Sequence, residues 1–144
     1  ICYQILRNMK FAILLVGLMG LLGLSETALA QKPWSKTSKG YTVLVKGNTL
    51  RVADEDFPKS MSWDNALAAV AALGDGKWRL PTMEELRAIY QQLYVQDEGS
   101  FKTAAYYTGV EVTAANAWAM NFEMGNVYNC FKGNTLNVRV VRDN

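Results

Sequence analysis

The sequence predicts an α+β domain in which two helices pack on a mostly antiparallel sheet of short strands. Three observations lead to this fold class: β-rich runs open the domain, two amphipathic helical patterns follow, and further β-rich runs close it. Strands that are grouped on either side of the helices, instead of alternating with them, favour antiparallel pairing. Half of the 144 residues are hydrophobic and 19% are charged, which is typical of one globular domain.

Residues 1–30 are expected to be a secretion signal with a few residues upstream of the initiator Met9. A lysine follows Met9, an apolar run covers residues 11–24, and an Ala-Leu-Ala cleavage pattern ends at Ala30. We therefore predict cleavage before Gln31 and export to the periplasm, the outer surface or the medium. The apolar run is shorter than the roughly 20 residues that span a bilayer, so no stable membrane span is expected after cleavage. An uncleaved anchor is the alternative.

The mature chain begins with a polar, lysine-rich stretch, residues 31–40, which is expected to be a flexible leader to a single domain over residues 41–144. The domain opens with two β-rich runs, residues 41–46 and 49–52. These runs flank Gly47-Asn48, and glycine accepts the positive φ at the first position of a type II′ turn. A β-hairpin is predicted there.

A first helix is predicted over residues 62–73, with Ser62 as its N-cap and Gly74 at its end. Its buried stripe is expected to comprise Trp63, Ala66, Leu67, Val70 and Leu73. A second helix is predicted after Thr82, because Thr82 and Glu85 have the spacing of a capping box, in which both side chains bind free backbone amides. Its buried stripe is expected to comprise Leu86, Ile89, Tyr90 and Leu93.

Short β-rich runs separated by glycine and asparagine follow the helices, at residues 106–109, 117–122, 127–131 and 136–142. In the last run, apolar residues alternate with Asn137 and Arg139, which predicts a half-buried strand. The pentapeptide Lys-Gly-Asn-Thr-Leu occurs at residues 46–50 and again at residues 132–136. Shared turn chemistry in two hairpins is the favoured explanation, and an internal duplication is the alternative. Nothing between the two copies repeats, which excludes a solenoid.

Charge and cysteine content narrow the possible functions. The formal net charge is +2 and no block of lysine or arginine occurs, so the basic surface that nucleic-acid binding requires is missing. The chain has no histidine, the commonest general base and metal ligand. After signal removal Cys130 is the single cysteine, so no intrachain disulfide can form. We predict no catalytic residue, no metal site and no cofactor.

Several motifs between residues 61 and 142 resemble the Lcl C-terminal domain family of bacterial proteins, catalogued as a domain of unknown function. The most specific is Trp-Arg-Leu-Pro-Thr-x-x-Glu-Leu, whose first part is shared by the related Fibrobacter succinogenes major paralogous domain. A helix that opens on a tryptophan precedes it, and an Ala-Trp strand, a Phe-x-x-Gly turn and a terminal Val-Arg-x-Val-Arg strand follow. The residues that carry these motifs are Trp63, Trp78, Arg79, Leu80, Pro81, Thr82, Glu85, Trp118, Arg139 and Arg142.

The resemblance implies a C-type-lectin-like fold, similar to that of formylglycine-generating enzymes, and attachment to glycosaminoglycans and to host or bacterial surfaces. The chain departs from the family pattern at residues 106–109 and at Val140, where a cysteine is usual, and it has no collagen-like repeats. We expect an exported, non-catalytic, adhesin-like module that binds a glycan or a protein. One alternative is a structural or assembly subunit of the envelope that pairs through edge strands. A degenerate formylglycine-generator-like enzyme with a reactive Cys130 is another.

The C-terminal stretch is rich in asparagine, with a tyrosine and a lysine nearby, which predicts an adaptable polar binding surface. The candidate ligand-binding residues are Asn116, Asn121, Asn126, Tyr128, Asn129 and Lys132. Asparagines that merely serve turns and edge strands are the alternative.

The remaining conspicuous residues are expected to be structural. Trp78, Trp118 and Phe122 are predicted to lie in the core, and Arg79 is predicted to pair with Glu85 or Glu84. The run Asp54-Glu55-Asp56 is interpreted as a solvated acidic loop, with a calcium site as the alternative. Cys130 is interpreted as a buried, inert thiol, with intermolecular pairing as the alternative.

Overall fold

The computed structural model describes residues 34–37 and 40–144 of the chain. The chain divides into two units, Ile1–Ala30 and Gln31–Asn144, and every described strand and helix belongs to the second. The predicted signal segment and the predicted cleavage point between Ala30 and Gln31 lie outside the described residues. Within the described residues, no helix is both long and apolar enough to cross a membrane.

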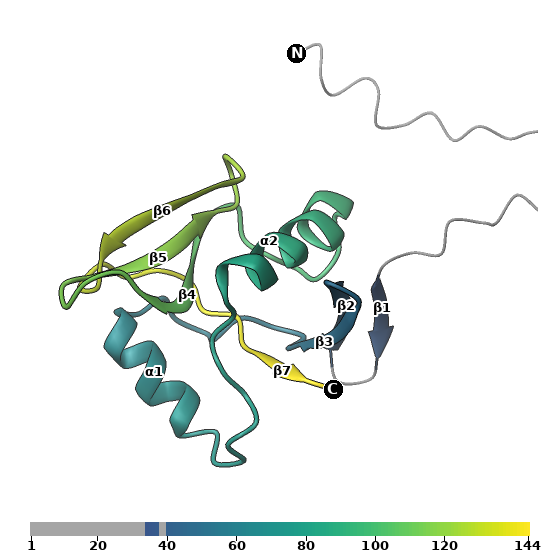
Figure 1. The fold of residues 1–144 in the computed structure, drawn as a ribbon, viewed down its shortest axis with the longest axis horizontal. Helices are drawn as coiled ribbons and strands as arrows, with labels where there is room; N and C mark the ends of the chain where they lie inside the picture. Colours follow the sequence, from purple (N-terminus) through teal and green to yellow (C-terminus); the bar gives the residue numbers. More distant parts are fainter. Residues whose placement is uncertain (1–33, 38–39) are drawn as a thin grey trace, which may run out of the picture. The chain divides into compact units, whose positions relative to one another are not determined.

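The strands of the domain form two antiparallel sheets (Figure 1). The first has the order β1-β2-β3-β7 and comprises β1 (Trp34–Thr37), β2 (Gly40–Val45), β3 (Asn48–Val52) and β7 (Val141–Asp143). The second has the order β4-β5-β6 and comprises β4 (Ala105–Glu111), β5 (Asn116–Asn121) and β6 (Asn126–Phe131). The predicted α+β class with antiparallel pairing is confirmed, although the strands form two sheets instead of one.

Two helices cover these sheets. Helix α2 (Met83–Gln92), followed by the short 3-10 helix η2 (Tyr94–Gln96), lies between the two sheets and contacts β2, β4 and β5. The capping box is confirmed, because the Thr82 hydroxyl accepts from the Glu85 amide and the Glu85 carboxylate accepts from the Thr82 amide. Helix α1 (Trp63–Ala71) packs against the β4–β6 sheet.

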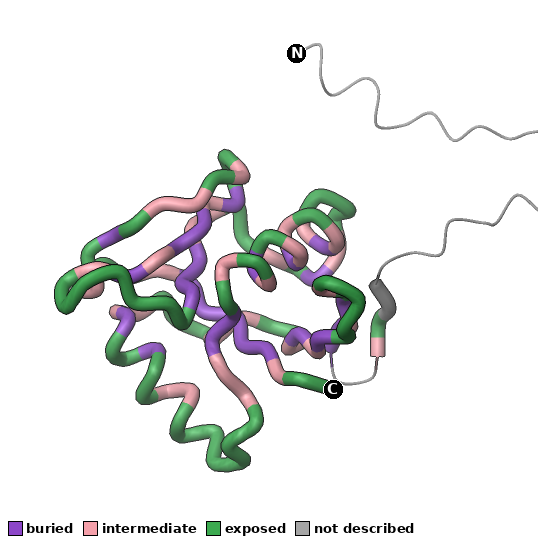
Figure 2. The backbone as a smooth tube through the Cα atoms, in the orientation of Figure 1, coloured by how far each residue is buried: buried purple, intermediate pink, exposed green. Residues whose placement is uncertain are grey.

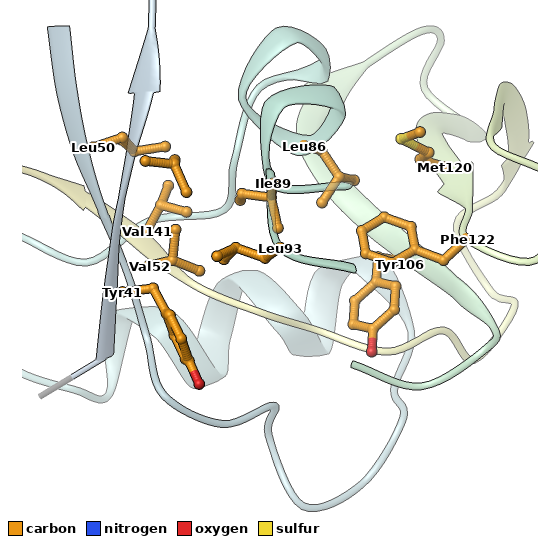
Figure 3. Close-up of a cluster of buried hydrophobic side chains, with 11 residues drawn as sticks. Tyr41, Leu50, Val52, Leu86, Ile89, Leu93, Tyr106, Met120, Phe122 and Val141 are labelled. Carbon is orange, nitrogen blue, oxygen red and sulfur yellow. The ribbon is translucent and has the colours of Figure 1, made fainter. Parts of the chain in front are cut away.

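The predicted stripe of α2 joins the sheets into one core. Leu86, Ile89 and Leu93 are fully buried, and Figure 3 shows them between apolar side chains of the two sheets. The first sheet contributes Tyr41, Val43, Leu50, Val52 and Val141, and the second contributes Tyr106, Met120 and Phe122. A second buried cluster lies under α1 and contains Trp63, Ala66, Leu80, Tyr107, Ala117, Ala119, Cys130, Val138 and Val140.

The first helix is shorter and less buried than predicted. It ends at Ala71, and Trp63 and Ala66 are buried as expected. Leu67 and Leu73 are 38% and 45% exposed, which contradicts their predicted burial. The first turn of the helix rests on the sheet and Val70 is half-buried against the second core cluster, whereas Leu67 and Leu73 lie outside that cluster.

The segment between β6 and β7 is not the predicted half-buried strand. Residues 137–140 are all buried, as Figure 2 shows in the centre of the domain. Asn137 bonds to the backbone of β4, whereas Val138 and Val140 accept hydrogen bonds from the amides of Phe57 and Ala53. The segment therefore links the β4–β6 sheet to the loop that follows β3, and a linker of this kind is buried on all sides.

The two hairpin predictions need correction. The turn between β2 and β3 consists of Lys46 and Gly47, with φ of 50° and 82°, so both central residues have positive φ as in a type I′ turn. The second copy of the pentapeptide forms no such turn. Lys132 extends the pairing of β6 by donating its amide to the Ala115 carbonyl, and Gly133 has no positive φ. Contacts with the rest of the domain, and not the pentapeptide sequence itself, therefore determine the backbone conformation.

The predicted leader also differs, because residues 34–37 form β1 and pair with β2 in antiparallel register. The outer edge of β2 offers unpaired backbone groups, and a neighbouring extended segment satisfies them.

Candidate functional site

The β4–β6 sheet has one face that is covered only in part. Cross-strand partners place their side chains on the same face of a sheet. Met120 pairs with Val127, and these residues lie under α2 in the first core cluster. Farther along the same face, Trp118 pairs with Asn129 and Asn116 pairs with Phe131. Neither buried cluster includes these four residues.

We call this region the open face and define it by Val110, Asn116, Trp118, Asn129 and Phe131. Val110 precedes Glu111, which pairs with Ala117 on the opposite face, so Val110 belongs to the open face. Phe131 is 59% exposed and Val110 is 37% exposed, Asn129 is exposed, and Trp118 and Asn116 are half-buried. The two aromatic rings and the two amides thus alternate across paired strands.

The side-chain amides of the open face are free of hydrogen bonds within the described part of the domain. Throughout residues 40–144, no hydrogen bond involves the side-chain amide of Asn116 or Asn129. Both groups can therefore donate to and accept from a ligand. None of the five defining side chains carries a charge. Aromatic side chains beside a few polar groups are common in binding sites.

The structure separates the six predicted ligand-binding residues. Asn116 and Asn129 lie on the open face. Asn126 and Tyr128 lie on the other face, opposite Asn121 and Ala119. The Asn121 side chain is used by the turn after β5, where its oxygen accepts from the amides of Glu123 at 2.8 Å and Met124 at 3.3 Å.

Lys132 is also committed elsewhere. Its ammonium group lies 2.6 Å from the Glu111 carboxylate and 4.4 Å from the centroid of the Trp63 ring, on the side of α1. Lys132 therefore stabilises the covered face and takes no part in the open face.

Trp118 and Phe131 were not predicted as site residues. Trp118 was expected in the core, and only Phe122 of that pair is buried there. The sequence of residues 127–131 did indicate that Phe131 faces outward. Side chains alternate along a strand, so a buried Cys130 places Asn129 and Phe131 on the opposite face. The missing information was the cross-strand register that adds Trp118 to them.

The other motif residues are structural. Arg79 makes a bidentate pair with Glu85 at 2.7 and 2.8 Å and contacts Asp143 at 2.9 Å, which confirms the predicted partner Glu85. Burial alone would raise the pKa of Glu85, but the Arg79 guanidinium and the Thr82 amide hold this pKa below its usual value. Trp78 packs against the second core cluster and carries the Arg142 guanidinium 5.3 Å from its ring centroid. Leu80 and Pro81 are buried at the entry to α2.

Arg139 is the most buried charge of the domain as described, with a fully buried side chain. Its Nε lies 2.6 Å from Asp56, and its other nitrogens donate to the carbonyls of Ala53, Asp54 and Gly99. The Tyr106 hydroxyl donates to the second Asp56 oxygen at 2.8 Å. Burial, followed by the hydrogen bond to Asp56, raises the pKa of Tyr106 well above its usual value.

This network corrects the interpretation of the acidic loop. Asp54 and Glu55 are exposed, but the Asp56 side chain is only 7% exposed and forms an ion pair with Arg139. Across the residues that the structure describes, no three cysteine or carboxylate side chains gather as a metal site would require.

Cys130 is buried beneath α1. Burial raises the pKa of the Cys130 thiol, while a hydrogen bond with Tyr107 acts in the opposite direction. A thiol with a raised pKa is a poor nucleophile near neutral pH, because the thiolate is the reactive species.

Together these features define a small α+β domain with two antiparallel sheets and one open sheet face. The chain belongs to the Lcl C-terminal domain family, whose model matches residues 27–142, and the resemblance seen in the motifs is thereby confirmed. No curated protein matches the chain.

Proposed function

We propose that the protein is an exported, non-catalytic binding module of C-type-lectin-like fold, which recognises a glycan or a protein at the cell envelope or surface in the manner of an adhesin. The observation that carries the proposal is the open face, where Trp118 and Phe131 present apolar ring surface beside the free amides of Asn116 and Asn129. Membership of the Lcl C-terminal domain family supports it.

The chemistry of the open face favours an uncharged ligand. Aromatic rings pack against the apolar faces of a sugar or of a protein side chain, and amides bond to hydroxyl or backbone groups. Sulfated polysaccharides require clustered cations, and the face has none. The nearby Lys132 is held by Glu111 and Trp63 on the opposite side. We therefore expect neutral glycans or uncharged protein surfaces to bind better than sulfated ones.

The burial of Cys130 and the raised pKa of its thiol support a non-catalytic role over a thiol-based enzyme. Native alkylation with iodoacetamide at pH 7.5 is expected to label Cys130 slowly, and unfolding in urea should restore the rate of an ordinary thiol. Rapid labelling of the folded protein would favour the enzyme instead.

Two assays test the proposal. Mature protein, residues 31–144, is applied to an array with neutral and sulfated glycans and is used to capture surface proteins of whole cells. A saturable signal on neutral glycans or on a defined protein is expected, and blank results in both assays would contradict binding.

Export is tested by fractionating cells that express the full chain and by N-terminal sequencing, which is expected to begin at Gln31. Retention of the uncleaved chain in the cytoplasm would contradict export.

A further inference from the structure

The outer edges of the two sheets are protected unequally. Beyond β7, Arg79 and Val141 exchange two backbone hydrogen bonds of 2.9 Å. Beyond β4, Asn137 bonds with Ala105 and Tyr107. Strand β1 carries the charged Lys36. Natural sheets protect their edges by coverage of this kind or by charges, because an exposed edge can pair with another strand.

Strand β6 has none of these protections. Its sequence, Asn-Val-Tyr-Asn-Cys-Phe, contains no charge and no proline, and its six residues pair with β5 in an unbroken register. No described element other than β5 packs extensively along it. An uncharged, regular edge of six residues is the form of strand most prone to pair with another.

The outward backbone groups of β6 follow from its pairing. The Lys132 amide donates to the Ala115 carbonyl, which marks a hydrogen-bonded pair in antiparallel register. Because such pairs alternate, Asn126, Tyr128 and Cys130 bond to β5, whereas the backbone groups of Val127, Asn129 and Phe131 point outward. The Phe131 carbonyl accepts from the Asn134 amide and from the Tyr107 hydroxyl, and the other five outward groups have no partner within residues 40–144.

These outward residues are self-complementary: an apolar side chain lies two positions on either side of Asn129. We propose that β6 pairs antiparallel with β6 of a second copy of this chain, about a two-fold axis through Asn129. Val127 then lies opposite Phe131 of the second copy, an aromatic and β-branched pair, and the two Asn129 residues lie opposite each other. No like charges meet, because the strand carries none.

The pairing forms one continuous six-stranded sheet in which both open faces lie on the same side. A two-fold contact uses the same surface on both subunits, so it closes as a dimer and leaves no further edge of this kind. The inference goes beyond the proposed function and does not depend on it, although a dimer would present two open faces to a multivalent surface.

The register also distinguishes this dimer from a disulfide-linked one. Cys130 lies opposite Tyr128 of the second copy, so the two cysteines are diagonal neighbours about 7–8 Å apart. This separation exceeds what a disulfide bridges without backbone movement. The dimer is therefore expected to persist in reducing agent.

Sedimentation velocity of the mature protein with reducing agent, over a hundredfold range of concentration, tests the proposal. The average mass is expected to rise from one chain to two. Asn129→Lys places like charges at the axis and should weaken dimerisation at least tenfold, whereas Asn48→Lys, at an exposed asparagine of the β2–β3 hairpin, should leave it unchanged.

Asn129→Pro serves as the second variant, because the only backbone hydrogen-bonding group that it removes is an outward amide, and an edge strand tolerates proline there. It is expected to weaken the dimer as well, and circular dichroism verifies that both variants are folded. A strict monomer at all concentrations, or folded Asn129 variants that dimerise like the wild type, would overturn the proposal. So would a dimer that disappears on reduction.

Discussion

Arg139 and Trp118 belong to the same C-terminal run of motifs, yet their surroundings are opposite. Every polar group around Arg139 is paired inside the domain, where one carboxylate, three carbonyls and the Phe101 ring surround the guanidinium. Trp118 and its neighbours Asn129 and Phe131 face outward, in neither core cluster. Structural residues such as Arg139 thus have their polar groups paired inside the domain. Residues whose polar groups or ring surfaces remain free are the candidates for binding.

The largest loss of stability is expected for Arg139→Met. This change leaves Asp56 buried without its cation, and breaking a buried ion pair in this way costs about 3–5 kcal/mol. Urea unfolding of this variant and of the control Arg142→Met, whose side chain is 27% exposed, measures the difference. Equal losses in the two variants would contradict the special role of the buried network.

A smaller loss is expected for Tyr106→Phe. The hydroxyl donates to one Asp56 oxygen and accepts from the Lys102 amide, so its removal takes one partner from each of these groups, at about 1–3 kcal/mol. Tyr128→Phe is the control, because no hydrogen bond of that hydroxyl occurs within residues 40–144, and about 0.5 kcal/mol or less is expected there. A Tyr106→Phe variant as stable as the control would show that the hydroxyl contributes nothing.

Glu85→Gln tests the partly exposed pair at the start of α2, with an expected loss of about 1 kcal/mol at pH 7 after allowance for solvent screening of Arg79. The pKa of Glu85 is lowered in the folded state, so its contribution is present above the unfolded pKa of about 4.3 and is lost as pH falls below that value. Unfolding curves between pH 2 and 7 should converge for variant and wild type at low pH. A constant gap would contradict the linkage.

The smallest effect on stability is expected for Phe131→Ala, within about 0.5 kcal/mol, because the side chain is largely exposed. Met124→Ala, at a residue that is 73% exposed in the turn after β5, is the matched control. Thermal unfolding of both variants well below the dimerising concentration checks this prediction. A loss above about 1 kcal/mol for Phe131→Ala would place Phe131 among the residues that complete the fold.

The sequence predicted features that depend on neighbouring residues better than features that depend on distant ones. The Thr82 and Glu85 cap and the α2 stripe depend on residues three or four positions apart, and they were predicted correctly. The burial of Arg139 depends on Asp56, 83 positions earlier, and a local alternating pattern suggested a half-exposed strand instead. Identical pentapeptides took different conformations because only one of them extends a strand of the β4–β6 sheet.

The candidate site was predictable in part for the same reason. Asparagine content indicated a polar surface, and Asn116 and Asn129 do lie on the open face. Which asparagines share a face depends on the pairing of β5 with β6, and the sequence alone does not give that register. Trp118 was assigned to the core because tryptophans in strands are usually buried.

Binding by a double variant, Trp118→Ala with Phe131→Ala, tests the open face most directly. The variant, the wild type and Met124→Ala are compared on the same neutral-glycan array and in the same cell-surface capture, with folding verified by circular dichroism. We expect the double variant to lose at least tenfold in apparent affinity while Met124→Ala binds like the wild type. A folded double variant that binds like the wild type would contradict the assignment of the open face as the binding surface.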